Sequence, residues 1–399
     1  MDKWNLLNGW EWKTLPEICE VNPPRPRIIR SDDAPTSFVP MQAVDDVEGR
    51  IVNMQTRLFG EVKRGYTYFE ENDVLFAKIT PSMENGKAAV ARGLIGGFGF
   101  GTTEFHVFHP HKWISPDWIF YYIRRKSFRS EAKAQFRGAV GQQRVPEDFL
   151  SAYSIPIPYP DDPARSLETQ RHIVTRLEAL LAEVAEARKM SDDLASNTNI
   201  FRKSALAYIF GQADENNWSM HRLGDLVDNY DGRRIPVREA DRKNQKKIYP
   251  YYGASGEIDK VENYLFDGEF LLVSEDGANL VARTYPIAFL ARGKFWVNNH
   301  AHVLQAKDET SNLFLAYAIE ATDISRYVTG AAQPKLSQTR MNDIPIWLPN
   351  NPGSQELVIQ YLRSVDDEIT ELKVGQMEMA SMLDLLEQSL LVVALRGEL

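Results

Sequence analysis

A helical seam occurs twice in the chain, 185 residues apart, and it limits the possible folds more than any other feature. Within residues 173–205, and again within 358–390, the seam positions follow one another at alternating steps of four and three. A 3.5-residue period held for more than four heptads is typical of a coiled coil. Two unrelated amphipathic helices have no reason to share one register, so we predict two long helices from a duplicated unit. The seam positions are Ile173, Leu177, Leu180, Val184, Ala187, Ser191, Leu194, Thr198, Phe201 and Ala205 in the first copy, and Val358, Leu362, Val365, Ile369, Leu372, Gln376, Met379, Leu383, Leu386 and Leu390 in the second.

The repeat extends upstream of each helix. A glutamine precedes each seam, an Ile-Pro stretch precedes the glutamine, and a Gly-rich loop precedes that stretch. Proline biases the residue before it away from the helical region, so each Ile-Pro stretch is expected to be extended. The matched pairs are Gln170 with Gln355, Ile155-Pro156-Ile157-Pro158 with Ile344-Pro345-Ile346, Gly138–Gln143 with Gly330–Lys335, Trp10 with Trp218, and Leu15 with Leu223.

Each half has a globular segment in front of its helix. β-rich runs bounded by Gly, Pro and Asn occur in both segments, and short helices are expected beside them. Each segment is therefore predicted to be a mixed α/β domain. The expected strands are 73–79, 104–108, 270–273 and 287–290, and the expected helices lie within 116–135 and 311–326.

The predicted fold class is α/β, with two mixed α/β domains separated by two long antiparallel coiled-coil helices in a pseudo-two-fold internal repeat. We place the first domain at 1–158, its helix at 159–211, the second domain at 212–349 and its helix at 350–399. The second domain begins where the first helix ends and finishes where the second helix begins. Antiparallel helices then need only short connections, which is the usual arrangement.

Composition narrows the class of protein. The single Cys19 excludes an internal disulfide and a cysteine-based zinc cluster, which fits a reducing, cytoplasmic setting. No apolar run reaches the roughly 18 residues of a membrane span, and no signal peptide is visible, so no membrane association is expected. The net charge of −9 is concentrated in residues 346–399, which carry nine acidic and three basic side chains. Overall charge therefore does not argue against a nucleic-acid partner, because the footprint that matters is local.

The chain resembles the specificity subunits of type I restriction-modification systems over essentially its whole length. The order of the matching fragments, duplicated around two matched helices, is what makes the resemblance specific. Two departures occur, the Gln-Gln-Arg of 142–144 and the acidic stretch at 161–166, and both blur the boundary of the first domain. The fragments are Gly9–Leu15, Phe76–Lys87, Thr102–Val107, Tyr249–Gly256, Glu275–Asn279, and Gln333–Ser337 before Ile344-Pro345-Ile346.

This resemblance implies a DNA-reading subunit without catalytic residues of its own. The two domains would be target recognition domains, each reading one half of a bipartite, asymmetric site in double-stranded DNA. Two methylation subunits would bind the helical pair, and two motor-nuclease subunits would join in the restriction complex. No cofactor is expected on this chain, because S-adenosylmethionine and ATP would be bound by those partners.

Other functions were weighed on individual motifs. A coiled-coil scaffold with two protein-binding domains is the main alternative, and a solitary DNA methyltransferase is a third. Asn22-Pro23-Pro24 is similar to a methyltransferase motif, but Arg25 stands where the base-stacking aromatic is needed. Gly97–Gly101 leads into a β-like run rather than a helix, and no phosphate-binding Gly-x-x-x-x-Gly-Lys loop exists. His106, His109 and His111 lack a fourth ligand cluster, so no metal site is predicted.

Candidate DNA contacts follow from side-chain chemistry. Lys and Arg bind phosphates, while Arg, Lys, Asn and Gln also pair with base edges. A basic run covers 124–137 in the first domain, and another covers 233–247 in the second. The predicted DNA-binding residues are Lys78, Asn85, Lys87, Arg125, Arg129, Gln142, Gln143 and Arg144 in the first domain, and Arg233, Arg234, Asn298, Asn299 and Lys335 in the second.

Overall fold

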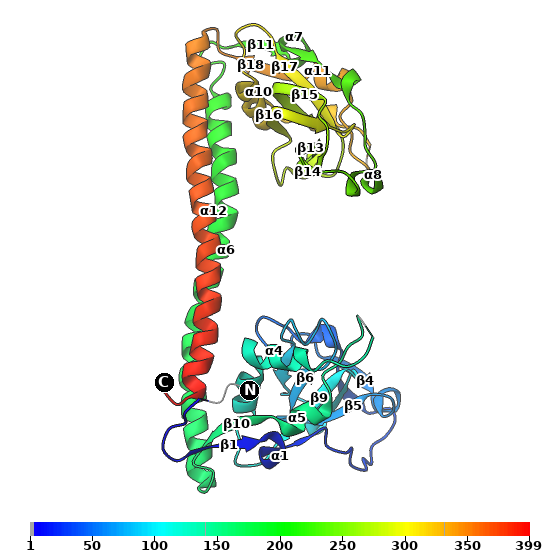
Figure 1. Ribbon diagram of the computed structural model, residues 1–399, viewed down its shortest axis with the longest axis vertical. Coiled ribbons are helices and arrows are strands. Elements are labelled where there is room, and N and C mark those ends of the chain that lie inside the picture. Colours follow the sequence, from blue (N-terminus) through cyan, green and yellow to red (C-terminus); the bar gives the residue numbers. More distant parts are fainter. Residues whose placement is uncertain (1–3, 140, 331) are drawn as a thin grey trace. The chain divides into compact units, whose positions relative to one another are not determined.

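The computed structural model describes residues 4–139, 141–330 and 332–399. The chain forms two compact units, one made of residues 1–190 and 379–399 and the other of residues 191–378. Each unit contains one mixed α/β domain, part of the long helix α6 (Pro163–Gly211) and part of the long helix α12 (Pro352–Leu395) (Figure 1). The first unit is therefore assembled from two segments that are remote in the sequence.

The main sheet of the first unit has the strand order β2-β9-β6-β7. A second sheet has the order β4-β3-β8-β5, and β1 pairs with β10. In β6 the side chains of Val74 and Phe76 enter one core, while Leu75 and Ala77 enter another. The alternation explains why this strand is apolar throughout, because a sheet with cores on both faces needs no polar face. The strands are β1 (Trp10–Thr14), β2 (Cys19–Val21), β3 (Pro35–Val39), β4 (Gln55–Leu58), β5 (Thr67–Glu70), β6 (Val74–Ala77), β7 (Ala88–Val90), β8 (Phe98–Gly101), β9 (Phe105–Pro110) and β10 (Ser154–Pro158).

The helices of this domain are short. The predicted helical stretch 116–135 is divided in two, since Arg125 adopts an extended conformation with ψ of 137°. Trp118 and Tyr122 of α3 are buried in the main core. The helices are α1 (Leu15–Ile18), α2 (Phe59–Val62), α3 (Pro116–Arg124), α4 (Lys126–Ala134) and α5 (Glu147–Ala152).

The second unit has one six-stranded sheet of order β12-β17-β15-β16-β13-β14 and a pair formed by β11 and β18. Its β15 repeats the alternation of β6, because Leu271 and Val273 enter one core while Phe270 and Leu272 enter the other. The elements are β11 (Ser219–Arg222), α7 (Leu223–Leu226), β12 (Val227–Asn229), α8 (Glu239–Lys243), β13 (Tyr249–Gly253), β14 (Gly256–Val261), β15 (Phe266–Ser274), α9 (Asn279–Ala282), β16 (Ala288–Val297), β17 (Ala301–Ala306), α10 (Asn312–Ala321), α11 (Gln338–Asn342) and β18 (Pro345–Leu348).

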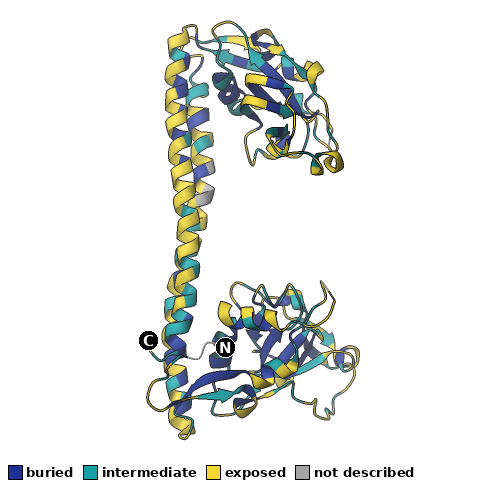
Figure 2. Ribbon diagram, in the orientation of Figure 1, coloured by how far each residue is buried: buried dark blue, intermediate teal, exposed yellow. Residues whose placement is uncertain are grey.

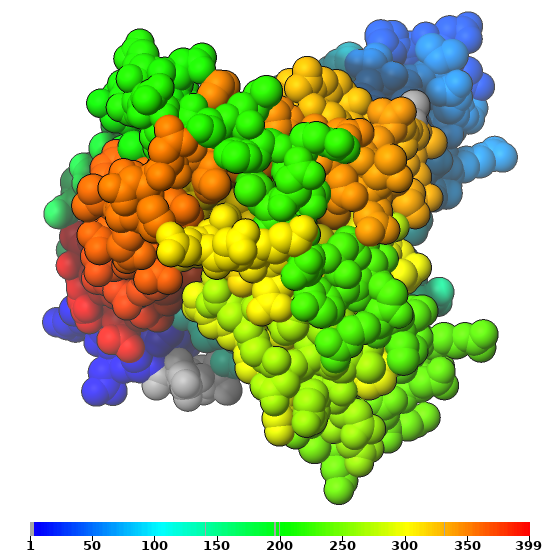
Figure 3. Space-filling view, turned by 90° about the horizontal axis from the view of Figure 1, so that it is seen from above, coloured from blue at the N-terminus to red at the C-terminus, as the bar shows by residue number. Residues whose placement is uncertain are grey.

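The extended Ile-Pro stretches are confirmed as β10 and β18. Leu15 donates its backbone N–H to Tyr153, and Leu223 donates to Ile344, so Tyr153 rather than Ile155 is the counterpart of Ile344. The predicted alignment of the two stretches was thus wrong by two residues. Figure 3 shows the face of the second unit on which the segment after α6 (green) and the start of α12 (orange) lie side by side.

The two predicted long helices are confirmed, and in each unit α6 and α12 run antiparallel. In the first unit Arg188 pairs with Asp384 at 2.7 Å, and in the second Arg202 pairs with Asp366 at 2.8 Å. The seam is buried where it packs against a domain, as at Leu177 and Leu362. Other seam positions are exposed, which the coiled-coil pattern did not predict (Figure 2); they include Leu194, Phe201, Leu372, Met379 and Leu386.

Candidate nucleic-acid interface

Both units carry a polar cluster at the same edge of the main sheet. In the first unit this is the edge where β6 ends and β9 begins, and we define its cluster, the first polar edge, by Lys78, Glu104 and Arg144. In the second unit β15 ends and β17 begins there, and the second polar edge comprises Glu275, His300 and Lys335.

The strand registers establish which residues correspond. Phe76 pairs with His106 in the first sheet, and Val273 pairs with His302 in the second. Counting outward from these pairs, Lys78 corresponds to Glu275 and Glu104 to His300. The equivalent edges therefore carry different charges on the same backbone frame.

The loop that crosses each edge is held by the same backbone bonds. Arg144 exchanges two backbone hydrogen bonds with Arg137, as Lys335 does with Thr329. The next residue then donates to the end of the central strand, from Val145 to Lys78 at 2.9 Å and from Leu336 to Glu275 at 2.7 Å. Arg144 and Lys335 thus occupy the same place in the two domains, which confirms the matching of their loops in the sequence.

A buried histidine ties down the first loop. His106 Nε2 lies 2.9 Å from the carbonyl oxygen of Val145, which can only accept, so this nitrogen donates. His106 Nδ1 lies 3.0 Å from the amide nitrogen of Asn22 and accepts from it. Burial lowers the pKa of His106, which agrees with a neutral imidazole.

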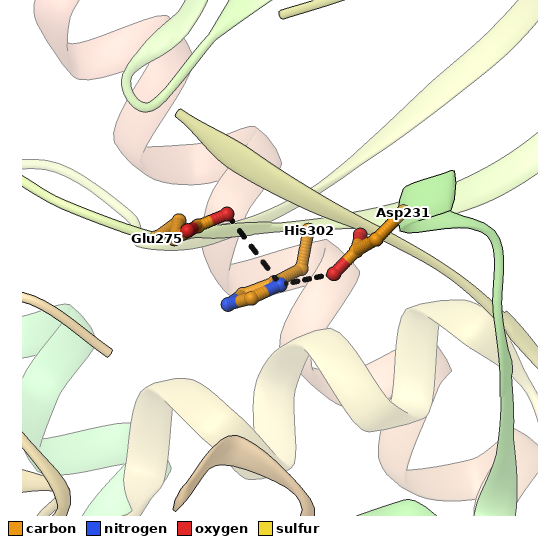
Figure 4. Close-up of side chains that lie close together, drawn as sticks. All are labelled: Asp231, Glu275 and His302. Atoms are coloured by element: carbon orange, nitrogen blue, oxygen red, sulfur yellow. Dashed lines mark hydrogen bonds and ion pairs between the residues drawn. The ribbon is translucent and has the colours of Figure 1, made fainter. Parts of the chain in front are cut away.

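The second loop is tied down by a charged version of the same contact. His302 Nε2 lies 2.8 Å from the carbonyl oxygen of Leu336, while Nδ1 lies 2.6 Å from Asp231. Figure 4 shows the imidazole between Asp231 and the more distant Glu275. Both ring nitrogens face acceptors, so this geometry suits an imidazolium.

Electrostatics in this second cluster favour ionised carboxyl groups. Burial raises the pKa of Asp231, but the hydrogen bond and charge of His302, the N–H of Val303 and the charge of Arg234 outweigh it, and the net shift is downward. Glu275 behaves alike, because its contacts with Arg234, His302 and Lys335 overcome burial and lower its pKa. The cluster is therefore a compensated network of charges.

Asp231, Glu275 and His302 could also hold a metal ion by their spacing. However, both nitrogens of His302 already bond to protein atoms, and Arg234 Nη1 lies 2.7 Å from Glu275. These contacts fit an internal ion network better than a ligand set. The absence of a resident metal and of any directly bound cofactor stays a prediction.

The remaining predicted residues of the first domain differ in exposure. Asn85 is exposed, whereas Lys87 donates its ammonium to the carbonyl oxygen of Val44 at 2.5 Å. Gln142 is exposed, and the carbonyl oxygen of Gln143 accepts from the N–H of Thr80 at 3.0 Å.

Two predicted arginines of the first domain are packed against the protein. Arg125 is buried, with its guanidinium 3.7 Å from the ring centre of Tyr122. Arg129 donates to the carbonyl oxygen of Glu84 at 2.8 Å, and burial lowers its pKa. The geometry gives Arg125 a packing role that the basic run did not predict, because charge patterning alone does not show which face of a helix is covered.

In the second domain, the predicted residues divide similarly. Arg233 is exposed and lies over Phe266, while Arg234 is half-buried between Asp231 and Glu275. Asn298 is buried and accepts from the N–H of His300 at 2.8 Å, whereas Asn299 is exposed beside it.

Comparison with known proteins gives the family. Residues 8–190 and 215–378 match the model described as the type I restriction modification DNA specificity domain. The chain belongs to this family. Both matched segments contain one mixed domain with its polar edge, so the duplication found in the sequence is a duplication of the specificity domain.

Relatives and solved structures agree with that assignment. The chain is 33% identical over 218 residues to the EcoEI specificity subunit and 37% identical over 179 residues to the EcoAI specificity subunit, both from Escherichia coli. These alignments cover 49% and 44% of this chain but only 36% and 29% of the relatives, so the chain matches about a third of their length. The fold is similar, with a TM-score of 0.78 and 20% identity, to a chain from a structure reported as the basis of complex assembly and conformational transition of the type I R-M system; all of both chains is covered.

Sequence reasoning missed the residues that support the edge. Asn22 was considered only as part of a methyltransferase-like motif, His302 was not considered, and Glu104 was noted only within a family fragment. A usable signal was present, because the dipeptide His-Val occurs at 106–107 and again at 302–303 in the two β-rich runs. No helix in the described ranges combines the length and apolar character needed to cross a membrane.

Proposed function

We propose that the chain is the DNA sequence-specificity subunit of a type I restriction-modification enzyme. Each polar edge would read one half of a bipartite, asymmetric site in double-stranded DNA. The observation that carries the proposal is one backbone frame, built twice, which presents different polar side chains at the same edge. Two readers that differ only in the displayed groups are what an asymmetric site requires, because base edges are distinguished by their donors and acceptors.

Catalysis would belong to other subunits. We infer that S-adenosylmethionine and ATP are bound by the methylation and motor-nuclease partners rather than by this chain. The buried histidines support this inference, because both nitrogens of His106 and of His302 are already bonded to the protein. Neither ring is free to act as a general base on a substrate.

The helices offer a surface for the methylation subunits. Large apolar side chains on α12 stay exposed, including Met377 at 75%, Met382 at 69% and Leu385 at 69%. Exposed apolar residues of this size in a row favour a partner rather than solvent. We propose that two methylation subunits dock on the helices and that two motor-nuclease subunits join in the restriction complex.

A methylation map tests the function. The chain is co-expressed with a type I methylation subunit in a host without adenine methylation, and modified bases are sequenced across the genome. We expect a two-part asymmetric motif with a fixed spacer, absent when this chain is omitted. A stable complex that adds no methylation would favour the scaffold alternative, and methyl transfer by the isolated chain would favour a methyltransferase.

Docking is tested separately by co-purification. Leu385→Glu should abolish recovery of the methylation subunit, because it places a charge in the exposed apolar row. Ser389→Glu is the matched control, since it adds the same charge at an exposed polar position of the same helix. Equal recovery with both variants would show that the apolar row is not the docking surface.

A further inference from the structure

The contacts of Arg144 point to a specific base pair. Its Nε lies 2.9 Å from Glu104 Oε2, and its Nη2 lies 2.7 Å from Glu104 Oε1. Its Nη1 donates to the carbonyl oxygen of Gln142 at 2.7 Å. The Nε side of the guanidinium is therefore fully used, and Glu104 fixes the plane and direction of the group.

Two N–H groups of Arg144 are left over. The guanidinium has five N–H donors, of which two bond to Glu104 and one bonds to Gln142. The remaining pair, one on Nη1 and one on Nη2, forms the outer end of the fork. No acceptor for this pair lies within the ranges that the structure describes, and the side chain is 41% exposed. A parallel pair of donors at the end of an arginine fork matches the O6 and N7 acceptors of guanine in the major groove.

The base of this side chain is rigid. The backbone of 143–145 is bonded to Thr80, to Arg137, to Lys78 and to His106. The N–H of Glu104 is held in turn by the Thr102 hydroxyl at 3.3 Å. A reader fixed in this way loses little conformational freedom on binding, which favours a directional contact over a loose phosphate contact.

We propose that Arg144 is a specificity-determining residue that reads the guanine of a G·C pair, with Glu104 as its positioning residue. The proposal rests on the proposed function, because it assumes that the first polar edge faces DNA. Lys335, the counterpart in the second domain, presents a single ammonium 3.2 Å from Glu275 and cannot make a two-point contact. The requirement for guanine thus belongs to the half-site of the first domain.

Selection of binding sites tests the assignment. The full chain, in complex with its methylation subunits, is used to enrich sequences from a random duplex library. Arg144→Ala and Arg144→Lys should each lose the preference for guanine at one position, with discrimination there falling on the order of tenfold to hundredfold. The rest of the motif should persist. Glu104→Gln should weaken the same position to a smaller extent, because the amide still bonds but the charge is lost.

Controls separate the possible failures. Arg92→Gln removes another salt-bridged arginine, which follows the opposite end of β7, and should leave the motif unchanged. A uniform loss of affinity at all positions in Arg144→Ala would overturn the assignment in favour of a phosphate contact. An unchanged motif would overturn it as well. If the unmodified complex enriches no sequence, the proposed function itself fails, and the assignment fails with it.

Discussion

In the first unit the buried histidine of the polar edge faces an amide, and in the second unit it faces a carboxylate. His106 accepts from Asn22 and is neutral, whereas His302 lies between Leu336 and Asp231 in a network of charges. The backbone bonds around the two rings are the same. The comparison teaches that this frame fixes the loop position with one geometry but tolerates two electrostatic solutions, so charge at the edge can change while the loop stays in place.

Removing the carboxylate should have the largest effect. Asp231→Ala leaves His302 and Arg234 without a buried counter-charge and leaves the N–H of Val303 unpaired. We expect the free energy of unfolding of the second unit to fall by about 3–5 kcal/mol, the usual cost of breaking a buried ion pair. Hydrogen–deuterium exchange of β17, with β9 as the internal reference, measures the loss in one unit alone.

The comparison is sharpened by Asp231→Asn. This variant gives the second unit the amide that the first unit has, so His302 can become neutral and accept. The loss should then be smaller than for alanine. Because the pKa of Asp231 is lowered on folding, its stabilisation is complete above its unfolded-state pKa and disappears as the pH falls through the folded value. Equal losses in both variants would contradict the idea that the two tethers are interchangeable.

A buried acid found only in the first unit should have the next largest effect. Asp73 lies 2.6 Å from His109, whereas the strand registers place Phe270 and Gln305 at the corresponding positions of the second unit. Burial raises the pKa of Asp73 to about 6, despite the Glu70 N–H and His109. The folded state therefore holds this proton more tightly than the unfolded state does, and stability falls as the pH rises from about 4 through 6.

Asp73→Asn removes that dependence. At pH 8 the variant should be more stable than the parent by about 1–3 kcal/mol, because it has no buried charge to desolvate. At pH 4 the two should be similar. Urea unfolding at both pH values gives the comparison, and a variant that is less stable at pH 8 would show that the ion pair with His109 outweighs burial.

The glutamines before the two seams should give the smallest difference. Gln170 accepts from the N–H of Ser115 at 2.9 Å and donates to Trp113 and Ser166, whereas Gln355 accepts from Ser311 at 3.3 Å. Gln170→Ala should cost about 1–2 kcal/mol and Gln355→Ala about 1 kcal/mol or less, since fewer buried bonds are lost. Thermal unfolding of both variants tests the order, and the reverse order would break the equivalence of the two helix starts.

Much of the fold was accessible from the sequence because it is repeated. The 185-residue offset, the glutamines and the Ile-Pro stretches predicted two α/β domains with long antiparallel helices. The position of Arg144 and Lys335 at one edge was also accessible from their matched loops. Burial was not, because Arg125 lies in a basic run yet stacks on Tyr122. The supporting pairs, such as Asn22 with His106, join residues 84 positions apart, and no local pattern shows such a contact.

The division of the first unit between residues 1–190 and 379–399 has a consequence for biosynthesis. Leu391, Ala394 and Leu395 belong to the main core of that unit, beside Leu177 of α6. The ribosome must make residues 191–378 before it reaches this segment, which takes roughly 10–40 s at 5–20 residues per second. During that interval the first domain waits with part of its apolar surface uncovered, while the second unit, which is continuous in the chain, can close first.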